Sequence, residues 1–137
     1  MILRYRAWDK IRKTMYEADD IMYIDFEEKQ ICVKTLFFER ASRYDFNDIV
    51  LMQSTGLKDK NGKEIFEGDI IAINLEGIET PITAKVFQNR KIGILMFHAF
   101  EDNEDVPMVE LLEGNSVEFA IIGNIWEDPE LTEVNHD

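Results

Sequence analysis

The sequence predicts an all-β protein, a small and partly open SH3-like barrel with an N-terminal β-hairpin subdomain. Short apolar and β-branched segments recur about every ten residues, which is the spacing of strands in small barrels and sandwiches. Glycine, asparagine and aspartate fall between these segments, where tight turns need them. A chain of 137 residues is long enough to bury a hydrophobic core and favours one domain with an appended subdomain.

Residues 1–48 predict one strand followed by a hairpin. The strand is expected over 4–8, where polar and bulky side chains alternate, and the chain is expected to turn at 9–10. Apolar residues over 21–26 and 31–33 flank the polar run Glu27–Gln30, which is a strand–turn–strand pattern. Residues 36–44 fit a short helix or a loop, and both interpretations stay open.

The barrel is predicted over residues 49–131. Its strands are expected over six runs rich in apolar residues, of which the last two follow an acidic loop at 101–105. The runs are 49–53, 70–75, 82–87, 92–97, 108–112 and 117–126. Residues 128–131 are expected to form one helical turn, and 132–137 a flexible acidic tail.

Charge divides the chain into two parts. Residues 92–137 contain 12 acidic side chains and no Lys or Arg, within a chain whose net charge is −13. Residues 1–13 contain one acidic side chain, Asp9, and the bases Arg4, Arg6, Lys10, Arg12 and Lys13. The acidic part can be a solvated face that keeps the protein soluble. It can also be a negative surface that recruits a basic partner, or the basic N-terminus of an identical subunit.

The candidate interaction residues follow from this division. They are Arg4, Arg6 and Trp8 at the basic end and Glu101, Asp102, Glu104 and Asp105 in the acidic loop. The interleaved arginines and aromatic residues of 4–8 are also typical of platforms that bind single-stranded nucleic acid. Strand geometry divides them between two faces, however, and the acidic third of the chain would repel phosphates. We therefore expect a homo-oligomer or a basic host protein as partner, and neither a nucleic acid nor a membrane.

The sequence offers no catalytic, cofactor or metal site. Cys32 lies between apolar residues and is interpreted as a buried thiol, and without a second cysteine it favours a reducing compartment, the host cytoplasm. His98 is interpreted as a hydrogen-bonded strand histidine, and neither it nor His136 has the spacing of metal ligands. Residues 59–62 begin like a calcium loop, but glycine and lysine stand where the EF-hand needs other residues.

Three segments have a distinctive composition: 6–10, 55–71 and 122–131. Gly56 is expected to need a positive φ or close backbone approach. Asn61 and Gly62 predict a tight turn, because both residues tolerate a positive φ. Gly68 and Asp69 predict a second turn, in which the carboxylate accepts backbone N–H bonds. With Gly123 and Trp126 of the last segment, these residues are interpreted as structural.

The three segments resemble, in order, the opening, central and closing motifs of the YopX family of phage and prophage proteins. The seventeen residues of 55–71 carry most of the resemblance. It implies a phage or prophage origin, a mostly-β fold and no established activity, and it supplies no catalytic residues. An accessory protein that acts by binding is the expected function. Residues 68–73 are also similar to the strand opening of small-barrel toxin endoribonucleases, so a nucleic-acid-binding or RNA-cleaving protein is the alternative.

Overall fold

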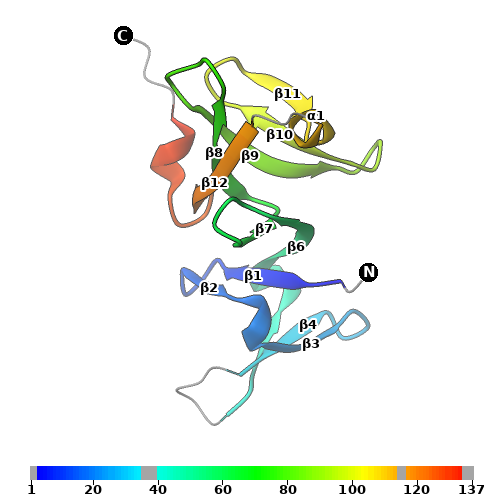
Figure 1. Ribbon diagram of the computed structural model, residues 1–137. Helices are drawn as coiled ribbons and strands as arrows, with labels where there is room; N and C mark the ends of the chain where they lie inside the picture. The colour runs from blue at the N-terminus through cyan, green and yellow to red at the C-terminus, as the bar shows by residue number, and fades with distance from the viewer. Residues whose placement is uncertain (1–2, 35–39, 114–116, 134–137) are drawn as a thin grey trace. The chain divides into compact units, whose positions relative to one another are not determined.

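The computed structural model describes residues 3–34, 40–113 and 117–133, and the chain divides into two compact units. Unit 1 covers residues 1–54 and unit 2 covers residues 55–137 (Figure 1). The elements that begin in unit 1 are β1 (Tyr5–Asp9), β2 (Thr14–Tyr16), η1 (Ala18–Asp20), β3 (Ile21–Asp25), β4 (Gln30–Val33), β5 (Ser42–Asp45), η2 (Phe46–Asp48) and β6 (Ile49–Lys58). Those of unit 2 are β7 (Glu64–Phe66), β8 (Asp69–Leu75), β9 (Ile82–Asn89), β10 (Ile94–Ala99), β11 (Glu104–Pro107), α1 (Val109–Leu112), β12 (Val117–Asn124) and η3 (Pro129–Thr132).

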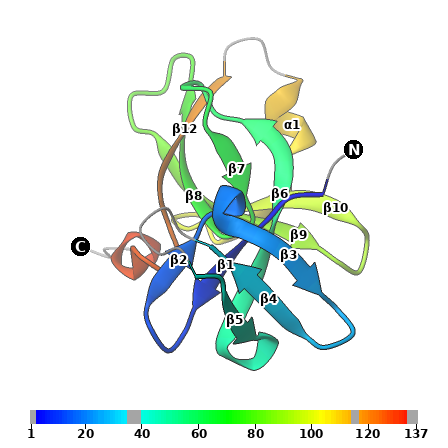
Figure 2. The same ribbon diagram turned by 90° about the horizontal axis from the view of Figure 1, so that it is seen from below.

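Unit 1 is built from two small antiparallel groups of strands. β1 pairs with β2 on one side and with the first residues of β6 on the other, and β4 lies between β3 and β5 (Figure 2). Strand alternation sends one side chain of β1, Ala7, into a core that also holds Tyr16, Ile31, Val33 and Ile49. The Tyr16 and Tyr44 rings stack at 4.8 Å between centroids and close this core.

Unit 2 is a curled, half-barrel sheet of five antiparallel strands. Their order is β11-β10-β9-β8-β12, and β12 carries a bulge between Ile121 and Gly123. The inward-facing side chains of β8, β9 and β10 form the core with residues of β7 and α1; they are Ile65, Ile71, Ile73, Ala84, Val86, Phe97, Met108 and Leu111. The predicted mostly-β fold with a partly open barrel is thereby confirmed.

Several local predictions agree with the structure. The hairpin of residues 21–33 is β3 and β4 with a turn at Glu27–Lys29, and the helical turn after residue 128 is η3. Cys32 is buried and forms no disulfide. The segment 36–44 is described from residue 40 onward, where β5 begins at Ser42, and residues 35–39 lie outside the described part.

Other local predictions were wrong. The strand predicted over 108–112 is the helix α1, because a helical turn buries Met108 and Leu111, three residues apart, on one face. The strand before it is β11, so Glu104 and Asp105 belong to a strand and not to a loop. In the predicted tail, Thr132 ends η3, and residues 134–137, including His136, lie outside the described part.

Candidate functional site

The burial of β1 changes the predicted basic surface. Arg6 and Trp8 are each only 6% exposed, so they do not offer the accessible interaction surface that the sequence suggested. Arg4 is partly exposed and forms an ion pair with Asp19 at 3.2 Å. The exposed positive charge near the start of the chain therefore lies further on, in the β1–β2 turn.

This turn, residues Lys10–Lys13, is termed the hairpin tip. Asp9 organises it from inside the protein, because its side chain is fully buried and its Oδ1 accepts the backbone N–H groups of Ile11 and Arg12, both at 2.9 Å. Asp9 Oδ2 accepts the Tyr16 hydroxyl at 2.6 Å and the Arg12 guanidinium at 3.1 Å. The tip is thus a defined loop anchored by one carboxylate.

The hydrogen bonds of Asp9 explain its ionisation. Burial alone would raise the pKa of Asp9, but the bonds from Tyr16, Arg12 and Ile11 favour the carboxylate and leave the pKa below its usual value. Burial and the bond to Asp9 raise the pKa of Tyr16 above its usual value. The carboxylate therefore stays charged and the phenol neutral at physiological pH, which keeps the tip in place.

The four acidic residues that the sequence suggested for interaction lie in two different elements. Glu101 and Asp102 lie in the turn between β10 and β11, whereas Glu104 and Asp105 lie in β11. Asp105 Oδ1 lies 2.7 Å from His98 Nδ1 on the neighbouring strand, so His98 is hydrogen-bonded, as the sequence predicted. All four acidic side chains are exposed, and Glu101 borders a pocket in unit 2.

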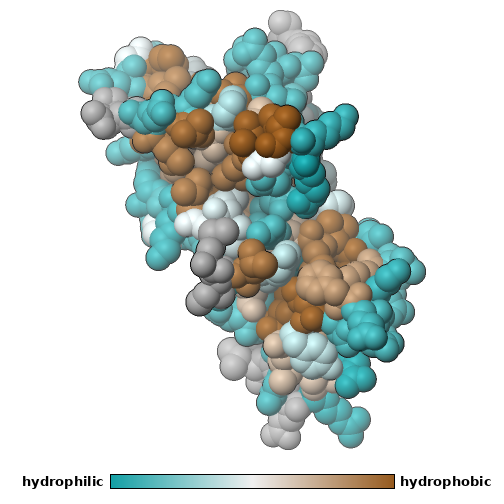
Figure 3. Space-filling model, turned by 90° about the vertical axis from the view of Figure 1, so that its right-hand side faces the viewer, coloured by the Kyte–Doolittle hydropathy of each residue, from teal (hydrophilic) through white to brown (hydrophobic). Residues whose placement is uncertain are grey.

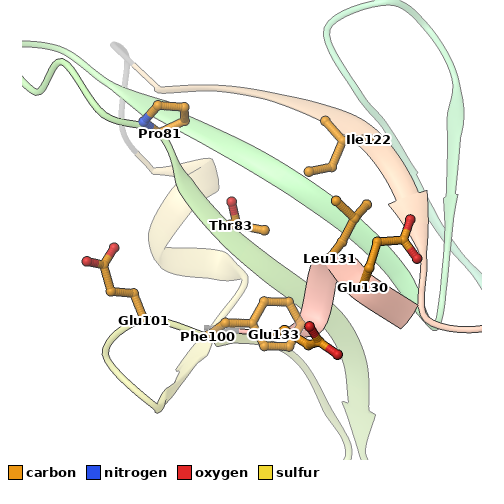
Figure 4. A pocket seen from close by; sticks show the side chains of 8 residues that line it. All are labelled: Pro81, Thr83, Phe100, Glu101, Ile122, Glu130, Leu131 and Glu133. Atoms are coloured by element: carbon orange, nitrogen blue, oxygen red, sulfur yellow. The ribbon is translucent and has the colours of Figure 1, made fainter. Parts of the chain in front are cut away.

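This acidic pocket is a hollow of about 360 Å³ in unit 2 (Figure 4). Its lining comes from the start of β9, the turn after β10, β12 and η3. The apolar part consists of Pro81, Phe100, Ile122 and Leu131, together with Thr83. Three exposed carboxylates border it, those of Glu101, Glu130 and Glu133. None of the three takes part in the ion pairs found among the described residues.

The closing motif 122–131 builds one wall of this pocket. The Asn124 side-chain oxygen accepts the backbone N–H groups of Trp126 and Glu127 at 3.0 and 2.8 Å, and Asp128 Oδ2 accepts that of Asn124 at 3.1 Å. A Cβ at Gly123 would lie 2.5 Å from Asp128 Oδ2 and 2.9 Å from Leu131 Cδ1. A side chain at this position would have to displace those of Asp128 and Leu131, which pack η3 and the turn before it against β12.

The central motif contains a structural residue that sequence reasoning missed, Asp59. It is 7% exposed, and its carboxylate accepts three backbone N–H groups: Oδ1 those of Asn61 (3.0 Å) and Lys63 (2.9 Å), and Oδ2 that of Ile121 (2.9 Å). Burial opposes ionisation, but these bonds outweigh it and lower the pKa of Asp59. Residues 59–62, which resemble the start of a calcium loop, thus form a hydrogen-bonded turn that is joined to β12 by the bond from the Ile121 N–H to Asp59.

The other motif residues take structural roles. Gly56, Gly62 and Gly68 have positive φ, and the space around Gly56 is open, so backbone conformation and not close approach requires glycine there. The predicted turn at Asn61 and Gly62 is present, and of the two residues Gly62 adopts the positive φ. Asp69 accepts the Phe66 N–H at 2.8 Å, as predicted, and its side chain is 1% exposed.

A second hollow lies on unit 1. This apolar groove has a volume of about 460 Å³ and is bordered mainly by residues of β3 and of the chain before β1. Leu3, Met22 and Phe26 in its lining are each more than half exposed. Figure 3 shows hydrophobic side chains gathered at the surface of both units on the face in view.

The described part of the chain contains neither a cluster of metal-ligating side chains nor a membrane-spanning helix. Over residues 3–34, 40–113 and 117–133, no three His, Cys, Asp or Glu side chains gather as a metal site would require. No helix among these residues is long and apolar enough to cross a membrane.

The fold and motifs are those of a mostly-β protein of two small units, in which the distinctive segments build turns and one wall of an acidic pocket. The model of the YopX protein family matches residues 4–133, and the chain belongs to this family. The resemblance predicted from the sequence is confirmed.

Two solved structures are similar over nearly their whole length. Protein EF1440 from Enterococcus faecalis is 30% identical, with a TM-score of 0.63 and coverage of 97% of this chain and 99% of that one. The yopX protein from Bacillus subtilis is 20% identical, with a TM-score of 0.65 and coverage of 95% and 98%. A comparison with curated proteins finds no significant match.

Proposed function

We propose that the protein is an accessory protein of phage or prophage origin that acts in the host cytoplasm by binding another protein, without catalysis. The acidic pocket is the proposed binding surface, and a basic segment with an apolar side chain is its ligand. One observation carries the proposal. The apolar floor of the pocket, formed by Pro81, Phe100, Ile122 and Leu131, is bordered by three glutamates. These glutamates, Glu101, Glu130 and Glu133, take part in none of the ion pairs found among the described residues.

The electrostatics of unit 2 support a basic ligand. Unit 2 contains 18 Asp and Glu against 6 Lys and Arg, whereas unit 1 contains 10 against 9. Such an excess attracts cationic surfaces and raises their association rate, and it repels the phosphates of nucleic acids. The apolar floor adds the burial of a side chain, which supplies affinity that surface ion pairs alone do not.

The candidate catalytic groups support binding over catalysis. Cys32 is buried in unit 1, and His98 is held by Asp105. Asp69, which stands in the segment similar to toxin endoribonucleases, is buried and bonded to the Phe66 N–H. Burial of Cys32 and Asp69 leaves neither side chain accessible to an RNA substrate.

The test is a titration of the isotope-labelled protein with two short peptides. One peptide joins lysines to a central isoleucine, and the other replaces the lysines by glutamates. We expect chemical-shift changes at Phe100, Ile122 and Leu131 with the basic peptide alone, weakened by salt. Equal shifts with both peptides, or none at these residues, would overturn the proposal. Cleavage of RNA by the purified protein would favour the enzyme alternative.

A further inference from the structure

The hairpin tip has the chemistry that the acidic pocket would bind. Ile11 is 67% exposed at the tip, the highest value among the large hydrophobic side chains of the described residues. It stands between Lys10 and Arg12, and Lys13 follows with a positive φ of 53°. The tip is therefore an apolar side chain surrounded by positive charge.

The cations of the tip differ in their availability. Arg12 is bonded to Asp9 and lies over the Tyr44 ring, 4.9 Å from its centroid. Lys10 and Lys13 are exposed, and the ion pairs among the described residues do not include them. The tip thus has two ammonium groups to offer to a partner, and its backbone is already ordered by Asp9. An ordered loop loses less conformational entropy on binding than a flexible one.

We propose that the hairpin tip of one copy of the chain docks into the acidic pocket of a second copy. Ile11 enters the apolar floor formed by Phe100, Ile122 and Leu131, and Lys10 and Lys13 lie against the bordering glutamates. This inference rests on the proposed function, because it names the basic partner as the protein itself. It also assigns the predicted self-association to particular residues.

Two properties favour a second copy as the occupant. The charges are complementary, since the tip is basic and the pocket border acidic. The pocket volume of about 360 Å³ is large enough for one aliphatic side chain with the stems of neighbouring lysines. Contacts this small give weak, salt-sensitive association.

The first experiment measures the mass of the full chain by sedimentation at protein concentrations from about 1 µM to about 1 mM. At about 30 mM salt we expect the average mass to rise above that of a monomer as the protein concentration increases. At about 500 mM salt this increase in mass should be smaller. Replacing Ile11 by serine should weaken association about tenfold, because the side chain loses its apolar burial. Since Ile11 is exposed, this change should leave folding intact. A wild-type monomer under all conditions overturns the inference.

The second experiment is a charge exchange. The variant K10E/K13E places negative charge on the tip, and E130K/E133K places positive charge on the pocket border. Each variant alone then has tip and pocket of like charge and should be monomeric. A mixture of the two should associate, because each tip meets a pocket of opposite charge. Failure of the mixture to associate, or association of either variant alone, overturns the inference.

Two matched variants control for net charge. K34E/K91E and E110K/E118K make the same charge changes at exposed positions outside the tip and pocket, and should change wild-type association by about twofold or less. The peptide titration separates the two proposals. Binding of the basic peptide with a monomeric wild-type chain retains the acidic pocket as a binding site and removes self-association. Absence of both removes both proposals.

Discussion

The side chain of Asp59 provides the sharpest test of how the central motif works. Its carboxylate receives the N–H groups of Asn61, Lys63 and Ile121 in a nearly buried position. In Asp59→Asn, the retained oxygen still accepts two of these bonds, but the amide donor replaces Oδ2 and faces the Ile121 N–H. Hydrogen bonds to charged groups contribute about 1.5–3 kcal/mol each, so we expect unit 2 to lose about 2–4 kcal/mol at pH 7.

The pH dependence carries the same reasoning further. Because the folded-state pKa of Asp59 is lowered, its stabilisation is present above the unfolded pKa, about 3.9, and is lost as pH falls through the folded value. The difference in unfolding free energy between wild type and Asp59→Asn should therefore narrow below about pH 4. If Asp59→Asn lowered the unfolding free energy by the same amount at every pH, the ionisation of Asp59 would not contribute to stability.

The assay is unfolding in urea, monitored by the fluorescence of Trp126. Trp8 is replaced by Phe in the reference protein and in the Asp59→Asn variant, so that the signal reports on unit 2 alone. With a slope of about 1–2 kcal/mol per molar urea, the midpoint should fall by about 1–4 M. Asp102→Asn, an exposed position in the same unit, serves as control and should change stability by about 0.5 kcal/mol or less. A loss below about 0.5 kcal/mol in Asp59→Asn would refute the assigned role.

Three further predictions concern turns. Gly123→Ala should destabilise unit 2 by about 1–3 kcal/mol in the same urea assay and weaken basic-peptide binding, because its Cβ would collide with Asp128; unchanged binding would contradict the wall described for the pocket. Asp9→Ala should raise amide hydrogen exchange at Ile11 about tenfold or more, since that N–H loses its acceptor; equal exchange would exclude the proposed anchoring. Gly62→Ala should cost about 1–2 kcal/mol through its positive φ of 80°, measured by the thermal midpoint.

The fold was largely predictable because its signals are local. Alternating apolar residues marked the hairpin of 21–33, and Gly68 with Asp69 marked a turn whose hydrogen bond the structure shows. The helix α1 escaped prediction because four residues, with Leu111 buried, are too few for a helical period to stand out. The short strand β2 was missed for a similar reason, since three residues show no alternation.

The site was less predictable because it depends on contacts between distant residues. Asp59 and Ile121 are 62 positions apart, and no local pattern announces their hydrogen bond. The acidic pocket takes its glutamates from the turn at Glu101 and from the region of η3. Composition revealed the acidity of the last 46 residues, but only folding brings Glu101 and Glu130 to the border of one apolar hollow.

The hairpin tip belongs to unit 1 and the acidic pocket to unit 2, so the proposed contact joins two different surfaces. A single contact of this heterologous kind leaves one tip and one pocket of the pair unused, and a dimer uses all of them only when a twofold axis relates the two copies. Copies added in the same geometry close into a ring when the rotation per copy divides a full turn, and otherwise extend as a filament. The placement of one exposed isoleucine would thereby determine whether the assembled protein has a fixed size.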